Sequence, residues 1–201
     1  NLFLALVAAR HAQGWAALVH LTQVARSQTD PARLYAAGLL GEVGGTEAIP
    51  ALLDLVESSD EDLAEVAIRQ LGELEVADAG PAIVRRMIDS ATKHHERADV
   101  YADSSEVARA AVKALVEIGD KSIEPQLVAA AKHAVPMVRM CAAEALGKLC
   151  GATAIPVLSD LVSDDDEAPY MYSHDDGGAS GGRLTVGLDL PGQRRIFSTS
   201  D

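Results

Sequence analysis

The sequence predicts an all-α fold, an α-solenoid of about 4.5 stacked helical hairpins followed by an extended C-terminal tail. The first observation is an internal repeat, because the segment 32–56 returns in similar form at 138–162. The second is composition: 48% of the 201 residues are hydrophobic but only 3% are aromatic. Alanine and other small residues therefore carry the packing, which suits close contact between helices better than a β-sandwich.

Prolines set the register of four copies of the repeat. Each proline lies nine residues after a common reference position, which is glycine in three of the copies. The prolines are Pro50, Pro81, Pro125 and Pro156, and the reference residues are Gly41, Gly72, Val116 and Gly147. The prolines are 31, 44 and 31 residues apart. The middle interval is therefore one repeat plus a 13-residue insertion, near residues 90–105.

Each copy is expected to form two helices. Apolar residues of the first helix recur at the helical period, as in Ala36, Ala37, Leu40 and Val43. The proline then falls in the first turn of the second helix, where its missing N–H costs nothing. A half copy precedes the four, with residues 15–26 as its second helix and the first ten residues as its partner.

At these positions the chain resembles the HEAT-like repeats of bacterial proteins, including the short repeats of phycobilisome-lyase relatives. The resemblance covers roughly residues 30–163 and implies the solenoid. It also implies that an arginine early in the first helix ties neighbouring repeats together. Arg33 and Arg139 match that position, whereas Ala64 and Ala108 occupy it in the middle copies. No polar ladder is therefore expected there.

Some HEAT-like proteins are enzymes, and the di-iron deoxyhypusine hydroxylases carry His-Glu pairs just after that arginine. The corresponding positions here are Leu34-Tyr35, Glu65-Val66, Arg109-Ala110 and Met140-Cys141. None is a His-Glu pair, and Leu, Ala and Met cannot replace metal-binding carboxylates and imidazoles. That activity is therefore not expected.

The histidine cluster His94-His95-Glu96 lies in the insertion and lacks the spacing of a metal motif. We interpret it as a solvated loop or helix extension. The sequence contains no GxSxG, Walker or GxGxxG motif, so no catalytic, cofactor-binding or metal-binding residue is predicted.

The charge balance excludes one class of partner. The chain has 17 Lys+Arg against 30 Asp+Glu, a net charge of −13, with a pI near 4.8, which argues against nucleic-acid binding.

No apolar run approaching a membrane span and no signal peptide were recognised, so membrane insertion is not expected. Cys141 and Cys150 are expected to be reduced, partly buried thiols, consistent with a cytoplasmic protein. The first residue, Asn1, and the helical apolar pattern that begins at once suggest that the numbered chain starts inside a longer protein or after a processed segment.

The composition of the chain changes after residue 163 and again after residue 182. Residues 1–163 form the predicted solenoid, 164–182 an acidic, Gly-rich linker, and 183–201 an extended or β-hairpin arm. In the arm, apolar residues alternate with polar or small ones: Leu184, Val186, Leu188 and Leu190. An isolated hairpin is marginal in water. The arm is therefore disordered, folds back on the solenoid, or adds to a partner's sheet edge, and we favour the partner.

These patterns favour a non-enzymatic protein–protein interaction scaffold, an accessory or assembly subunit of a larger complex. The expected contact residues are the outward positions of the second helices and the alternating residues of the arm: Asp54, Glu57, Arg85, Lys132, Asp160, Leu184, Val186, Leu188 and Leu190. Two alternatives stay open. The chain is a bilin-lyase-like protein that handles a chromophore, or a fragment of a larger regulatory protein.

Overall fold

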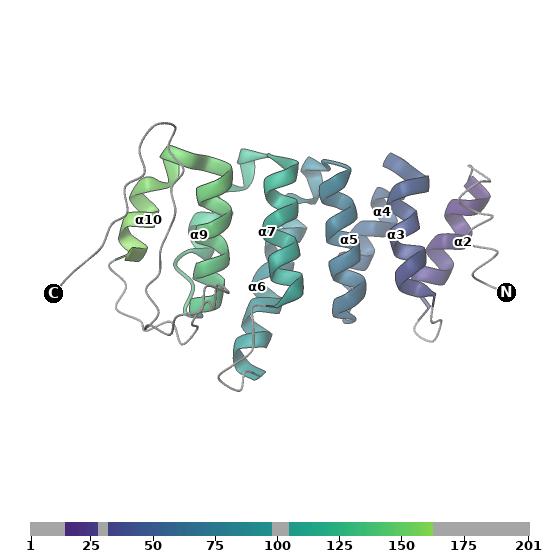
Figure 1. Ribbon diagram of the computed structural model, residues 1–201, viewed down its shortest axis with the longest axis horizontal. Coiled ribbons are helices and arrows are strands. Elements are labelled where there is room, and N and C mark those ends of the chain that lie inside the picture. The colour runs from purple at the N-terminus through teal and green to yellow at the C-terminus, as the bar shows by residue number, and fades with distance from the viewer. Residues whose placement is uncertain (1–14, 28–31, 98–104, 163–201) are drawn as a thin grey trace, which may run out of the picture.

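The computed structural model describes residues 15–27, 32–97 and 105–162. Figure 1 shows the helices standing side by side in a row, from α2 near the N-terminus to α10. After α2 (Trp15–Ala25), the first helices of the four hairpins are α3 (Arg33–Gly44), α5 (Glu61–Glu73), α7 (Glu106–Ile118) and α9 (Pro136–Cys150). The second helices are α4 (Ile49–Val56), α6 (Gly80–Arg97), α8 (Glu124–Ala130) and α10 (Ile155–Val162).

The predicted solenoid is confirmed. The first helices stack in sequence, α3 on α5, α5 on α7 and α7 on α9, and the second helices form a layer behind them (Figure 1). A short 3-10 helix joins the two helices of each hairpin: Gly45–Ala48, Ala77–Ala79, Lys121–Ile123 and Gly151–Ala154. Helix α2 is the predicted second helix of the half copy, and the first ten residues lie outside the described part.

The repeat register follows the prolines, as predicted. Pro50, Pro81, Pro125 and Pro156 each occupy the second residue of their helix, α4, α6, α8 and α10. The apolar stripe of the first helix is buried, with Ala36, Ala37 and Leu40 fully inaccessible to solvent. Because every hairpin buries the same positions, one continuous core runs through the described solenoid.

Two reference glycines set the distance between neighbouring first helices. A Cβ on Gly72 would lie 2.8 Å from the Cβ of Ala114 and 2.9 Å from its Cα, on α7. A Cβ on Gly41 would overlap the buried side chain of Gln70, on α5. At both interfaces the next helix occupies the space that a side chain would need. Glycine is therefore required by packing at these positions.

The insertion lengthens one second helix. α6 has 18 residues, whereas α4 and α10 have 8 each, and its C-terminal half extends beyond the other helices (Figure 1). His94 and His95 lie on this extension, so the helix extension, not the loop, is the correct interpretation of their segment. The extension is tied to α7 by a buried hydrogen bond of 2.6 Å between the Ser90 and Ser105 hydroxyls.

One predicted link between repeats is present at the first interface. Arg33, on α3, donates from Nε and Nη2 to Asp60 Oδ2 at 3.0 and 2.8 Å. Asp60 is also the N-cap of α5, where Oδ1 accepts the Leu63 N–H. Arg139, at the matching position of α9, donates to the carbonyls of His133 and Ala134, in the segment between α8 and α9, and the chain beyond residue 162 lies outside the described part.

This arrangement predicts a pH dependence of stability. Burial alone would raise the pKa of Asp60, but the hydrogen bonds from Arg33 and Leu63 hold it below its usual value. The lowered pKa therefore stabilises the fold above the unfolded-state pKa, about 3.9, and this contribution is lost as pH falls through the folded-state value. Asparagine also caps helices well, so Asp60→Asn removes the charge and keeps the cap.

Urea unfolding at a series of pH values between 7 and 3 checks this prediction. The wild type is expected to lose more stability on acidification than Asp60→Asn, and an Arg33→Gln background should remove most of the difference. Equal acid sensitivity of the wild type and Asp60→Asn would show that the ion pair contributes nothing.

One apolar segment differs from the expectation from sequence. Pro136–Asp160 is long and apolar enough to cross a membrane by length and composition, with a mean hydropathy of 1.3 over an 18-residue window, although no run approaching that length was expected. The structure divides it into α9, a 3-10 turn and α10, and half of its most apolar window is buried in the solenoid. Core helices pass the same test, so this segment is only a weak indication of a membrane span.

Candidate protein-binding surface

The second helices form the candidate surface, here called the second-helix row: α2, α4, α6, α8 and α10. The five predicted contact residues of the row are all exposed: Asp54, Glu57, Arg85, Lys132 and Asp160. The four predicted contact residues of the arm, Leu184, Val186, Leu188 and Leu190, lie outside the described residues. The structure therefore places only the solenoid part of the predicted site.

Three of these five residues form ion pairs between neighbouring repeats. Arg26, at the end of α2, binds Asp54 on α4, and Arg85 Nη2 on α6 lies 2.6 Å from Glu57 Oε1. Both pairs join residues 28 positions apart. They connect the residue seven after the proline position of one copy to the residue four after the proline of the next. Ion pairs within the chain, between neighbouring repeats, therefore already engage Asp54, Glu57 and Arg85.

The equivalent pairs of positions farther along the row hold different side chains. The next two positions are Ile88 and Ala129, which carry no charge. The last two are Lys132 and Asp160, which have opposite charges and are exposed. Neither forms an ion pair with another residue in the described ranges. The N-terminal half of the row is therefore internally neutralised, whereas the turn after α8 and helix α10 each carry one charge without an ion-pair partner among the described residues.

Arg86 departs from the repeat pattern. It stands where the first copy has Leu55, and its side chain is only 5% exposed, so it does not extend to solvent. Its Nη1 lies 2.9 Å from Asp89 Oδ2. Its Nε and Nη2 are buried and have no hydrogen-bond partner. The position is one of the few in the described core where a charge replaces an apolar side chain.

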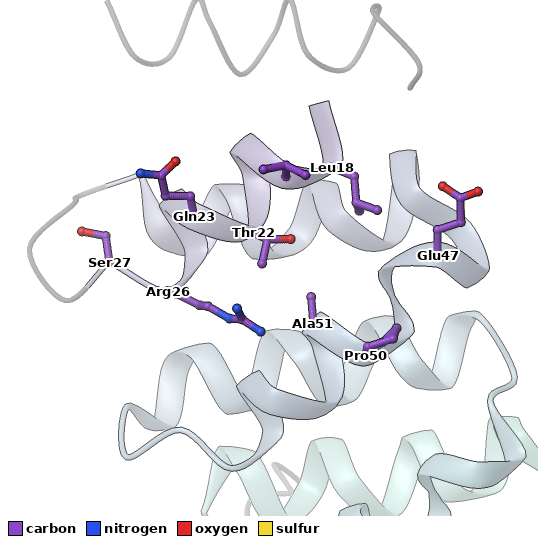
Figure 2. Close-up of a pocket in the computed structure, with 9 residues that line it drawn as sticks. Leu18, Thr22, Gln23, Arg26, Ser27, Glu47, Pro50 and Ala51 are labelled. Atoms are coloured by element: carbon purple, nitrogen blue, oxygen red, sulfur yellow. The ribbon is translucent and has the colours of Figure 1, made fainter. Parts of the chain in front are cut away.

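A groove opens at the N-terminal end of the row, between α2 and α4 (Figure 2). Its volume is about 600 Å³. It is lined by Leu18, Val19, Thr22, Gln23, Arg26, Ser27, Glu47, Pro50 and Ala51. The groove exists because α2 packs mainly against α3, whereas α4 packs against α6 and α6 against α8. Val19 is 49% exposed at its edge, a large share for an aliphatic side chain.

Sequence reasoning missed the groove and Arg26. A signal for Arg26 was present, because it lies one repeat length, 31 residues, before Glu57 and therefore occupies the equivalent outward position. No comparable signal exists for the groove. The groove depends on how α2 packs against its neighbours, which the repeat pattern does not specify.

The described residues offer little for catalysis. The two cysteines are free and buried, as expected. Burial, with a smaller effect from Glu144, raises the pKa of Cys141 to about 12, so its thiol is protonated at neutral pH. Burial and Glu124 also raise the pKa of Cys150. Within residues 15–27, 32–97 and 105–162, no three His, Cys, Asp or Glu side chains form a group able to hold a metal ion.

Comparison with known proteins agrees with this architecture. The family model of HEAT repeats matches residues 18–101 and 96–170. The fold is also similar to a chain in the solved complex of CpcE and CpcF of phycocyanin lyase from Nostoc sp. PCC7120, with a TM-score of 0.54 and 26% sequence identity. That match covers 81% of this chain and 64% of the other, so the similarity spans less than two thirds of that protein chain. No protein with a curated description matches the sequence.

Proposed function

The chain belongs to the HEAT-repeat family, and we propose that it is a non-enzymatic protein–protein interaction scaffold, an accessory or assembly subunit of a larger complex. The observation that carries the proposal is the exposed second-helix row, which repeats along the solenoid and ends in Lys132 and Asp160, two charges that form no ion pair with other described residues. Solenoids use such extended faces to bind other proteins. The solved relative, a complex of CpcE with CpcF, supports a protein partner.

We assign the partner surface to the C-terminal half of the row and to the arm. Lys132 and Asp160 are exposed and form no ion pair with described residues, so partner charges can meet them without breaking a contact between repeats. In this assignment residues 1–163 are the solenoid, 164–182 the linker and 183–201 the arm. The acidic excess favours a protein partner over a nucleic acid or an anionic membrane surface. The two free cysteines support a location in the cytoplasm.

Affinity purification of the tagged full chain from its native host, followed by mass spectrometry, tests the proposal. We expect a reproducible set of partners, with recovery reduced several-fold by Lys132→Glu combined with Asp160→Lys, because reversed charges on a docking face repel the partner. Deletion of residues 177–201 should also reduce recovery, because it removes the arm.

A matched variant separates this effect from general changes in charge. Lys113→Glu reverses an equally exposed lysine on α7, a first helix, and should leave recovery unchanged. Circular dichroism of each variant verifies folding. Unchanged partner recovery by all folded variants would contradict the assignment of the surface, and failure to recover any partner would contradict the scaffold itself.

The second candidate function is handling of a bilin chromophore. It is favoured by the 26% identity to a protein of phycocyanin lyase. A tetrapyrrole mixed with the full chain should then change its absorption spectrum, because a protein site restrains the pigment's conformation. No spectral change across a titration would remove this candidate.

A further inference from the structure

We propose that the groove between α2 and α4 is the docking site of the chain's own C-terminal arm, residues 183–201. The argument rests on the groove's lining, the pattern and charge of the arm, and the length of chain between them. The contact lies within one chain, and a partner that binds the arm, as proposed above, would have to displace it from the groove.

The groove suits an extended segment with alternating apolar side chains. Val19 on one side and Pro50 and Ala51 on the other supply apolar surface, whereas Leu18, on α2, is buried. Figure 2 shows the residues of α2 facing those of α4 across the groove. Along α2 the lining runs from Leu18 to Gln23, about 8 Å at 1.5 Å per residue, and it continues to Arg26 and Ser27 in the turn that follows the helix. Two alternate side chains of a strand span about 7 Å, at 3.3 Å per residue, and three span about 13 Å. The arm has four such residues in strict alternation.

The charges of the two elements are complementary. Glu47 is exposed at the groove and forms no ion pair with another described residue, whereas the charge of Arg26, which also lines the groove, is neutralised by Asp54. After Lys148 the sequence has no Lys or Arg until Arg183, the residue before the alternating run. The arm's other bases are Arg194 and Arg195. An arginine next to the apolar run can therefore pair with Glu47 at the groove's edge.

The chain is long enough to make this contact efficiently. Three steps of about 9 Å between packed helices separate α10 from α4, roughly 30 Å. The 20 residues from 163 to 182 have a root-mean-square span of about 25 Å as a flexible chain. Effective concentration is greatest when the span of a linker matches the distance to be bridged, and reaches the millimolar range. Even a weak affinity for the groove then holds the arm in place.

Cross-linking of the full chain tests this contact. Val19→Cys places a thiol at the groove, and Val186→Cys places one on the arm. With a short bifunctional maleimide at low protein concentration, we expect an intramolecular product, located by peptide mass mapping. Single-cysteine variants measure the background from Cys141 and Cys150, which are buried.

Lys132→Cys with Val186→Cys is the matched control. Lys132 is also exposed on the second-helix row and lies nearer to the start of the linker, so undirected motion of the arm would favour it. We expect Val19→Cys to react about tenfold faster than Lys132→Cys, from the local concentration that docking adds. Leu184→Asp with Leu188→Asp should abolish the preference, because these side chains share one face of the strand with position 186.

Two results would contradict the proposal, and each has a different meaning. Equal or faster reaction at Lys132→Cys would overturn the proposal. A cross-linked dimer that increases with protein concentration would overturn it in favour of a second copy as the occupant. Partner recovery has no part in this measurement, so its failure and that of the scaffold function are distinguishable.

Discussion

Replacing Gly72 by leucine is expected to destabilise the fold by about 3 kcal/mol, at the upper end of the usual cost of overpacking. A Cβ alone would lie 2.8 Å from the Cβ of Ala114 and 2.9 Å from its Cα. The backbone of α7 must therefore move away from α5, because no flexible side chain can absorb the overlap. The interface of α5 with α7 lies in the middle of the solenoid (Figure 1).

Urea unfolding followed by circular dichroism measures this effect. Stability in a solenoid is close to a sum of repeat and interface terms, so weakening a central interface should also uncouple the two halves and lower the slope of the transition. The same substitution at Gly38, on α3, is the control, because nothing lies within 4 Å of its Cβ position. Gly38→Leu is expected to be neutral or stabilising by up to about 1 kcal/mol, since leucine favours helix over glycine. Equal destabilisation by both variants would contradict the packing argument.

Residues that recur in every copy made the fold predictable. Pro50 and its three equivalents marked the start of each second helix because proline acts locally, through its own backbone. Ala36 and Ala37 marked the buried face for a similar reason, since helical period alone determines which residues share a side. Gly72 was recognised as a reference position, but its contact with Ala114 depends on how far apart two helices lie, which only the structure shows.

The candidate surface was predicted less completely. The outward positions of the second helices were found from the offset after each proline, and all five are exposed. Their pairing was missed because an ion pair such as Glu57 with Arg85 depends on how far successive second helices are shifted along their axes, and the sequence of a single copy does not encode that shift. The burial of Arg86 was also undetermined, because a long charged side chain at an apolar position can either extend to solvent or stay inside.

Arg86 gives the second prediction with a large expected effect. The side chain is buried, and Asp89 neutralises its charge through one nitrogen, while Nε and Nη2 are left without partners. Replacing a buried ion pair by an apolar side chain of similar volume is often neutral or stabilising by about 1–4 kcal/mol. Arg86→Leu restores the residue type that Leu55 has in the first copy, where it is buried. We therefore expect Arg86→Leu to raise the free energy of unfolding by about 1–3 kcal/mol.

The opposite sign is expected when the other end of the same ion pair is removed. Asp89→Ala leaves the Arg86 charge buried with no partner and should lower the free energy of unfolding by about 1–3 kcal/mol. Asp89 also binds Lys93 at 2.7 Å, so Lys93→Ala is the control, and loss of that exposed pair is worth less than about 1 kcal/mol. Urea unfolding of the three variants compares them directly. In the double variant Arg86→Leu with Asp89→Ala, most of the cost of Asp89→Ala should disappear, because the charge that needed Asp89 is gone. If Arg86→Leu instead lowers stability as much as Asp89→Ala does, the guanidinium stabilises the core as it stands, and its two free nitrogens cost less than burial implies.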